Sequence, residues 1–199
     1  MFFVLLLSAF GVRKRVDIAQ TRGEHLFQIY GDGKVGQTFV ASRNNLNIIF
    51  LDLKNAALRN QQPIYFHLEE AETAQSLREI EISGLNVGDP SSVRFQFNPI
   101  LDSAGKSYRF YLDSPTSTEE DAIEVYYSPQ NLYSDGEMII DDQKFGGELR
   151  FTSYYYPGSK TTVIRETIKD LMARLLTDKS FMIVYLALLF LIAGLSLVI

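Results

Sequence analysis

The sequence contains no cysteine and no tryptophan, and it has only two histidines and six prolines in 199 residues. The absence of cysteine excludes disulfides, thiolate metal ligands and a cysteine nucleophile. The histidines, His25 and His67, do not cluster, which excludes a zinc site of the usual composition. We find no Gly-x-Ser-x-Gly elbow, phosphate loop or dinucleotide fingerprint. We therefore expect a protein that is not an enzyme.

Charge is unevenly distributed, although the net charge is only −5. Residues 31–157 contain 19 acidic and 10 basic residues, whereas residues 1–30 and 158–199 each carry a net charge of +2. An acidic middle argues against nucleic-acid binding, which needs a basic surface. Basic flanks beside apolar runs indicate a nearby lipid bilayer. The residues expected at its interface are Arg13, Lys14, Arg15, Lys169, Arg174 and Lys179.

The C-terminal end is the most apolar part of the chain. Residues 181–199 contain no charge, and nineteen helical residues are about 28 Å long, close to the thickness of a bilayer core. A transmembrane helix is therefore predicted over residues 180–199. Before it, residues 159–179 place apolar side chains at helical spacing opposite a charged face. This pattern predicts an amphipathic helix, either in the membrane interface, which we favour, or packed on the globular domain.

The N-terminal apolar run is shorter. Twelve residues make about 18 Å of helix, too little to span a bilayer, and the basic residues follow the run, unlike those of a secretory signal. Residues 1–30 are therefore predicted to be a hydrophobic anchor, or an incomplete membrane helix, with a basic linker. The positive-inside rule would place the middle of the chain in the cytoplasm, but large domains cross membranes largely regardless of charge.

The middle of the chain, residues 31–158, alternates apolar and polar residues with a period of two. The segments 63–70, 93–100, 107–113 and 147–156 show this pattern clearly, and residues 46–54 are apolar on both faces, as in a central strand. Turn residues separate the segments at short intervals. About nine short strands predict a mainly β fold, an antiparallel β-sandwich or jelly roll.

The segment 97–115 poses a question about the turn Asp102–Lys106, which is either the mouth of a binding site or a corner of the sheet. Its flanking strands direct apolar residues inward, and Gly105 can adopt the positive φ that a tight corner needs. A purely structural turn is sufficient to explain the pattern.

Tyrosines near strand ends are the main candidates for ligand binding. A phenol ring can stack on the face of a sugar while its hydroxyl forms hydrogen bonds, and the candidates are Tyr126, Tyr133, Tyr154 and Tyr156. Alternation also requires that one of each adjacent pair be buried. Tyr154 and Tyr156 would alternatively anchor the domain at a membrane interface.

Acidic residues offer two weaker hypotheses. A structural calcium ion would draw oxygen ligands from flexible loops, and Asp102, Asp113, Asp135 and Asp141 are the candidates. No other cofactor is expected. Glycosidases use two carboxylates across a sugar, and acidic pairs occur at 69–70, 119–121 and 141–142. His67, on the outward face of its strand, is interpreted as a passive surface histidine.

Five segments carry a resemblance to a known kind of module. They are GQTF (36–39), IYFHLEE (64–70), FQFNPILDSAGKSYRFYLDSP (95–115), VYYSP (125–129) and GELRFTSYYYP (147–157). The chain resembles the β-sandwich module of uncharacterised bacterial multi-pass membrane proteins, some of which resemble glycosyltransferases of surface-polysaccharide pathways. The resemblance covers residues 36–157 and implies an extracytoplasmic, jelly-roll, carbohydrate-binding-like module of the cell envelope, but no catalytic residues.

These observations predict a membrane-anchored, non-catalytic binding module outside the cytoplasmic membrane. Its expected partners are the lipid bilayer and either an envelope glycan or a membrane glycosyltransferase. The alternatives are a scaffold that docks a protein partner and a glycoside-acting enzyme that uses the acidic pairs.

Overall fold

The computed structural model describes residues 11–196, and the side chains of residues 11–190. The chain divides into two units. One unit is Lys14–Tyr156, and the other comprises Met1–Arg13 with Pro157–Ile199.

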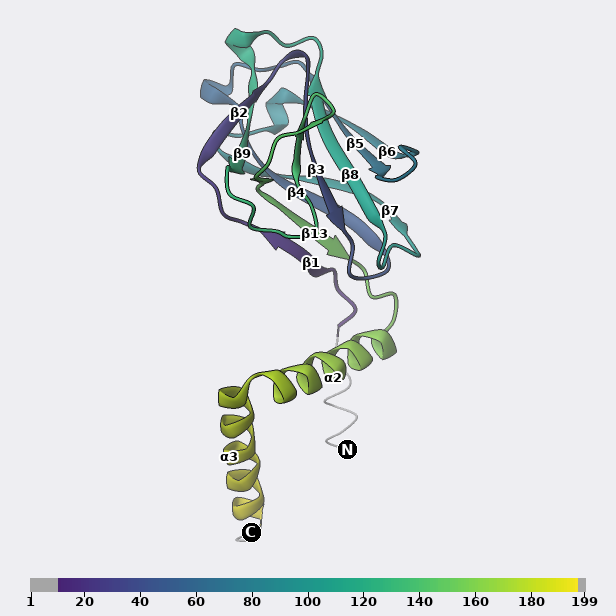
Figure 1. The fold of residues 1–199 in the computed structure, drawn as a ribbon, viewed down its shortest axis with the longest axis vertical. Helices are drawn as coiled ribbons and strands as arrows, with labels where there is room; N and C mark the ends of the chain where they lie inside the picture. Colours follow the sequence, from purple (N-terminus) through teal and green to yellow (C-terminus); the bar gives the residue numbers. More distant parts are fainter. Residues whose placement is uncertain (1–10, 197–199) are drawn as a thin grey trace. The chain divides into compact units, whose positions relative to one another are not determined.

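Strands joined by turns and short 3-10 helices make up the unit Lys14–Tyr156 (Figure 1). The strands are β1 (Arg15–Gln20), β2 (His25–Ile29), β3 (Gly31–Val40), β4 (Leu46–Lys54), β5 (Pro63–Glu70), β6 (Ser76–Ser83), β7 (Ser91–Ile100), β8 (Ser107–Ser114), β9 (Ile123–Ser128), β10 (Met138–Ile140), β11 (Gln143–Lys144), β12 (Glu148–Leu149) and β13 (Phe151–Tyr155). The 3-10 helices are η1 (Ala56–Leu58), η2 (Gly84–Asn86) and η3 (Glu119–Asp121).

The strands form two antiparallel sheets. Sheet A has seven strands in the order β1-β13-β4-β9-β12, and in addition β7 pairs with β4 and β2 pairs with β9. Sheet B has six strands in the order β11-β10-β3-β8-β5-β6. This arrangement confirms the predicted mainly β, sandwich-like fold, and it confirms the central position of β4, most of whose residues are buried.

Aromatic side chains join the two sheets in the core. Phe66 of β5 stacks on Phe95 of β7 with ring centroids 4.5 Å apart, and Phe110 of β8 packs edge-on against Phe151 of β13 at 5.4 Å. All four rings are at least 98 % buried. Each such ring contributes about 2 kcal/mol by burial. The alternation predicted for these strands is therefore correct, because large apolar side chains occupy most of their inward positions.

The sandwich begins earlier in the chain than predicted. Residues 15–29, which we expected to be a basic linker, form β1 and β2. Strand β1 pairs with β13, where Arg15 lies opposite Tyr155, and β2 pairs with β9. The prediction was wrong because both strands are short and partly exposed, so their alternation is weak. The anchor expected in residues 1–10 lies outside the described residues.

The segment 147–156, predicted as one strand, is two. Strand β12 pairs with β9, whereas β13 pairs with β1 and β4, and the change of partner occurs at Arg150. Short strands such as β11 and β12 raise the strand number above the nine expected, because two residues are too few to show a period of two.

Two helices follow the sandwich in sequence. The helix α2 (Lys160–Thr177) confirms the predicted helix at residues 159–179, and the side chain of Ser159 caps its N-terminus by accepting a hydrogen bond from the Thr162 N–H. Asp178 has extended backbone angles and separates α2 from α3 (Lys179–Ser196). Among residues 11–196, no helix is both long enough and apolar enough to span a membrane. The transmembrane helix predicted over 180–199 is thus unsupported, and its last three residues lie outside the described chain.

Candidate functional site

The outward face of sheet B brings together polar and aromatic side chains from three neighbouring strands. On the central strand β8, Phe110 and Leu112 point into the core, so Arg109, Tyr111 and Asp113 point outward. Strand pairing places His67 of β5 opposite Tyr111. These residues belong to segments more than 40 positions apart in the sequence, and only the sheet makes them neighbours.

Tyr111 occupies the middle of this face. The His67 ring stacks on the Tyr111 ring, with centroids 4.4 Å apart and planes inclined by 11°. Two cations lie over the Tyr111 ring, Lys34 Nζ at 5.4 Å and Arg109 Cζ at 5.7 Å from the centroid. Each such contact is worth about 0.5–1 kcal/mol near the surface. The phenol is therefore held in one orientation before any ligand arrives.

Gly36 leaves space beside this ring. It lies opposite Tyr111 in the pairing of β3 with β8. A Cβ atom at position 36 would lie 2.8 Å from the Cβ of Tyr111, closer than real side chains approach. Position 36 therefore adds no side chain of its own beside Tyr111.

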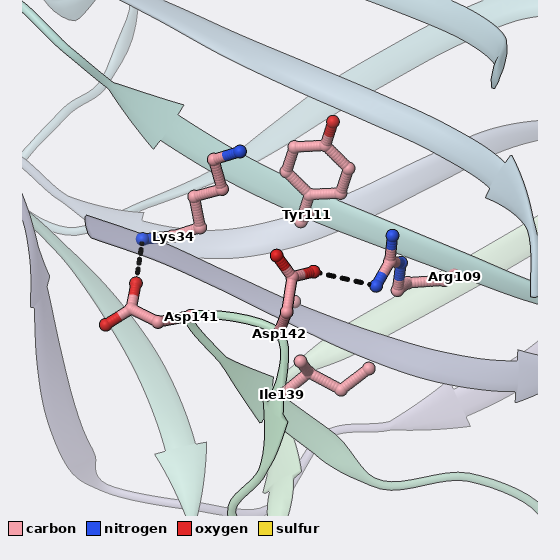
Figure 2. Close-up of a pocket in the computed structure, with 7 residues that line it drawn as sticks. Lys34, Arg109, Tyr111, Ile139, Asp141 and Asp142 are labelled. Atoms are coloured by element: carbon pink, nitrogen blue, oxygen red, sulfur yellow. Dashed lines mark hydrogen bonds and ion pairs between the residues drawn. The ribbon is translucent and has the colours of Figure 1, made fainter. Parts of the chain in front are cut away.

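Two carboxylates from different parts of the fold hold Arg109. Its Nε and Nη2 atoms donate to Glu69 Oε2 at 3.1 and 2.5 Å. Its Nη1 atom donates to Asp142 Oδ1 at 2.9 Å, as Figure 2 shows. The Glu69 side chain is only 11 % exposed, whereas that of Asp142 is 70 % exposed. Hydrogen bonds to two carboxylates fix the orientation of the Arg109 guanidinium. Arg109 thereby connects the less exposed Glu69 on β5 to the exposed Asp142.

The rim is the turn between β10 and β11. Asp141 and Asp142 both have positive φ, 48° and 62°, and they form the two-residue loop of a hairpin. Such angles at both positions characterise a type I′ turn. Asp141 Oδ1 accepts a hydrogen bond of 2.8 Å from the Lys34 N–H, which ties the turn to β3 (Figure 2).

Three adjoining hollows follow this rim. A notch of about 10 Å³ lies among Gly36, Tyr111 and Ile139. It shares Lys34, Asp141 and Asp142 with a hollow of about 410 Å³ that also includes Asp32 and Gly33. It shares Ile139 with a third hollow of about 520 Å³. We call the three adjoining hollows together the groove on sheet B. Its walls are mostly polar, so the groove suits a hydroxyl-rich ligand better than an apolar one.

Burial and the neighbouring Glu69 carboxylate raise the pKa of Tyr111. The phenol is therefore protonated at neutral pH and can donate a hydrogen bond. Three carboxylates, those of Asp32, Asp141 and Asp142, line the 410 Å³ hollow against the single ammonium of Lys34. An anionic ligand would be repelled there.

The candidate calcium ligands do not form a common site. Asp102 is in the turn between β7 and β8 and pairs with Lys106, Asp113 lies on β8 beside His67, Asp135 is in the loop before β10, and Asp141 is in the β10–β11 turn. Within the described residues, no group of three or more His, Cys, Asp or Glu side chains could hold a metal ion.

The predicted tyrosines lie in three different places. Tyr133 packs edge-on against Phe151, and its hydroxyl bonds to the backbone of Val40, so it is mainly a core residue. Tyr126 lines a separate hollow on sheet A. Tyr154 packs against Phe50 on the outward face of the same sheet. Tyr156 is 40 % exposed beyond the end of β13. The structure brings none of them into the groove on sheet B.

The residues expected at a membrane interface belong to both units of the chain. Lys14 lies over the rings of Phe50 and Tyr154, at 5.0 and 5.1 Å, and Arg15 lies in β1. Lys169 and Arg174 are exposed on α2, and Lys179 begins α3. Arg13 precedes β1 and belongs to the other unit.

Among the residues that line the groove, Asp135 and Asp141 were predicted only as calcium ligands, and Lys34, Arg109 and Tyr111 were not predicted as site residues. Arg109 and Tyr111 occupy outward positions of the alternating segment 107–113 and were given no role, and Asp113, on the same face, was named only as a calcium candidate. His67, expected to be passive, stacks on Tyr111, and its Nε2 atom lies 3.2 Å from Asp113 Oδ2. An alternation of aromatic and charged residues on the solvent face was the available signal.

Comparison with known proteins supports the fold alone. No protein-family profile matches the sequence, and no curated protein matches it. A solved structure of the cysteine protease and lectin-like domains of Cwp84, a surface-layer-associated protein of Clostridium difficile, is similar over 72 % of this chain with a TM-score of 0.50 and 10 % identity. The chain spans about 36 % of that structure.

A weaker likeness involves the CBM36-1 domain of a multidomain xylanase from the hindgut metagenome of Trinervitermes trinervoides. It has 9 % identity and a TM-score of 0.36, and the match covers 74 % of this chain and all of that domain. At this TM-score we draw no argument from it.

Proposed function

We propose that this chain is a non-catalytic carbohydrate-binding module that takes a neutral glycan in the groove on sheet B. The observation that carries the proposal is the Tyr111 ring, held by His67, Lys34 and Arg109 beside a polar hollow of about 410 Å³. A fixed aromatic ring next to converging hydrogen-bonding groups is the chemistry that sugar recognition uses. The sandwich fold, shared with a structure that includes a lectin-like domain, supports the proposal.

The charge of the hollow narrows the class of ligand. With three carboxylates and one ammonium along its wall, a neutral polysaccharide is the expected ligand, and an anionic polysaccharide is disfavoured. The carboxylates accept hydrogen bonds from sugar hydroxyls, and the Lys34 ammonium donates to them.

Affinity electrophoresis tests the proposal. The full-length protein is run through gels containing a β-glucan, a xylan, a mannan or, as the anionic comparison, an alginate. One of the neutral polysaccharides should retard it, and Tyr111→Ala should reduce the retardation. Tyr156→Ala, outside the groove, is the control. Because Tyr111→Ala removes buried area, Asp142→Asn is run in parallel as a milder change, and unfolding temperatures show which variants are folded.

Failure of every neutral polysaccharide to retard the native protein would overturn glycan binding. Stoichiometric co-purification of a protein partner would then favour the alternative, a scaffold module. Hydrolysis of a retarding polysaccharide that was lost in Glu69→Gln would contradict the non-catalytic part of the proposal.

We also propose that the protein is attached to the cell membrane, with the sandwich outside the cytoplasm. This proposal rests on the uncharged run 181–199, on the basic flanks and on the resemblance to modules of membrane proteins. The lack of cysteine permits a direct test, because Thr116→Cys introduces a single thiol at an exposed position. Reaction with a membrane-impermeant maleimide in intact cells supports the proposal. Reaction only after lysis, or recovery in the soluble fraction, contradicts it.

A further inference from the structure

A second hollow lies on the opposite side of the sandwich, on the outward face of sheet A. It has a volume of about 210 Å³ and is lined by Asp52, Pro90, Ser91, Ser92, Tyr126 and Arg150. On β4, Leu51 and Leu53 are completely buried, so Asp52 between them points outward. Tyr111 points outward from the other sheet, and the packed core separates the two faces. One sugar unit therefore cannot occupy both hollows.

Arg150 is the fixed element of this hollow. Its Nη2 atom lies 2.7 Å from Asp52 Oδ2, and its Nη1 atom donates to the Gly23 carbonyl at 3.2 Å. Its guanidinium lies over the Tyr126 ring, 5.0 Å from the centroid. The side chains of Arg150 and Asp52 remain 29 % and 27 % exposed. The pair is thus pre-organised but still accessible to a ligand, which lowers the entropic cost of binding.

The functional groups around Arg150 are complementary to those of a sugar. The Asp52 carboxylate accepts hydrogen bonds from hydroxyl groups, and the Ser91 and Ser92 hydroxyls can both donate and accept. The phenol and guanidinium planes supply a flat surface. Because the charges of Asp52 and Arg150 neutralise one another, the hollow favours a neutral ring over an anionic one.

The same face offers an extension along β4. Phe50 lies two positions before Asp52 on β4, so both residues face outward and are about 7 Å apart along the strand. The Phe50 and Tyr154 rings pack with centroids 5.3 Å apart, and Lys14 Nζ lies over both. A ligand longer than one sugar unit can therefore continue from the hollow across an aromatic surface.

We infer that the Asp52–Tyr126–Arg150 hollow is a second, independent binding site for a neutral glycan chain. This inference rests on the proposed glycan binding and goes beyond it, because it makes the module bivalent. Two sites on opposite faces allow one molecule to hold two polysaccharide strands, with a gain in avidity that needs no additional contact.

The test compares variants of the two faces in the full-length protein. Ser92→Leu fills the hollow on sheet A from an exposed position, and Tyr111→Ala removes the ring on sheet B. In gels containing β-glucan, xylan or mannan, each single variant should keep part of the retardation and the double variant should lose it. Titration calorimetry with the hexasaccharide of the retarding polymer should give two sites per chain for the native protein and one for either single variant.

Asp52→Asn is the second variant for the hollow on sheet A. It preserves the size of the side chain and removes its charge, and it should weaken the sheet A site about tenfold, the effect of losing one hydrogen bond to a charged group. This variant decides the question if Ser92→Leu does not fold.

The outcomes separate the two claims. If the native protein binds one hexasaccharide, Tyr111→Ala abolishes binding and neither Ser92→Leu nor Asp52→Asn changes it, the second site is overturned and the proposed function stands. If Ser92→Leu abolishes binding and Tyr111→Ala does not, the site on sheet A stands and the groove on sheet B falls. If no polysaccharide retards the native protein, both are overturned.

Discussion

Gly36 lies directly opposite Tyr111 on the neighbouring strand, and a side chain at position 36 would collide with the Cβ atom and backbone around Tyr111. A glycine in the middle of a strand normally weakens it. Here the missing side chain leaves room for the Tyr111 Cβ atom and for the notch that Gly36 and Tyr111 line. Both the stability of this part of sheet B and the shape of the groove therefore depend on the lack of a Cβ atom at residue 36.

Gly36→Ala is predicted to destabilise the protein by about 1–3 kcal/mol, the usual cost of forcing extra volume into a packed site. The added Cβ would lie 2.8 Å from the Tyr111 Cβ and still closer to the Phe110 carbonyl oxygen, so the backbone must shift. Urea denaturation measures the loss. Gly33→Ala is the control, because the nearest atom to its Cβ, the Tyr30 carbonyl oxygen, is 3.2 Å away. Equal losses in the two variants would contradict the argument.

Arg109→Met is predicted to lower the free energy of unfolding by about 1–3 kcal/mol. This is less than the effect of breaking a completely buried ion pair, because the Arg109 side chain retains some exposure. The change leaves the Glu69 carboxylate, only 11 % exposed, without its cation. Adding Glu69→Gln should recover part of the loss, and a double-mutant cycle by denaturation measures the coupling. Lys144→Met, which removes an exposed partner of Glu137, is the matched control and should change stability by less than about 0.5 kcal/mol. Additive effects of the two changes at Arg109 and Glu69 would refute the coupling.

Ser103→Ala should lower the free energy of unfolding by about 1–2 kcal/mol. The neighbouring change Asp102→Ala should lower it by less than about 0.5 kcal/mol. The Ser103 side chain is completely buried; its hydroxyl donates to the Arg43 carbonyl at 2.7 Å and accepts from the Leu46 N–H at 3.1 Å. Asp102 is exposed and pairs with Lys106. Thermal unfolding of the two variants tests whether this turn is a structural corner, as its sequence indicated. A larger effect of Asp102→Ala would contradict that role.

Strand patterning explains how much of the fold could be predicted. Where one face of a strand is buried, alternation determines which side chains point inward, and the prediction for Phe95, Phe110 and Phe151 was correct. Alternation fails for β1 and β2, which are short and partly exposed, and for β12, which has only two residues. These strands form because they pair with strands that are distant in the sequence, and a local sequence pattern carries no information about such pairing.

The candidate site could not be predicted for the same reason. Lys34, Tyr111 and Asp142 belong to three segments, and the register of β3 with β8 and the β10–β11 turn bring them together. A shift of the register by one residue would direct Tyr111 into the core. The predicted tyrosines were chosen for their chemistry alone, and Tyr126 alone among them lines one of the hollows we describe.

Glu148→Gln is predicted to stabilise the protein above neutral pH by about 3–4 kcal/mol and to leave stability below pH 4.5 nearly unchanged. Glu148 is completely buried; burial raises its pKa from 4.5 to about 7, against the opposing hydrogen bonds from the Gln37 side chain and the Tyr133 backbone. Between these two values the folded protein holds a proton that the unfolded chain releases, so stability falls as pH rises from about 4.5 to 7. Each unit of difference in pKa corresponds to about 1.4 kcal/mol.

The glutamine variant lacks this titration, so the curves of unfolding free energy against pH for the two proteins should coincide at pH 4 and separate up to about pH 7. Urea denaturation at half-unit intervals of pH gives both curves. Glu137→Gln is the control, since that carboxylate is more exposed and its replacement should not remove the slope. Parallel curves for native protein and Glu148→Gln would mean that the Glu148 carboxyl has the same pKa in the folded protein as in the unfolded chain, because its hydrogen-bond donors offset the effect of burial.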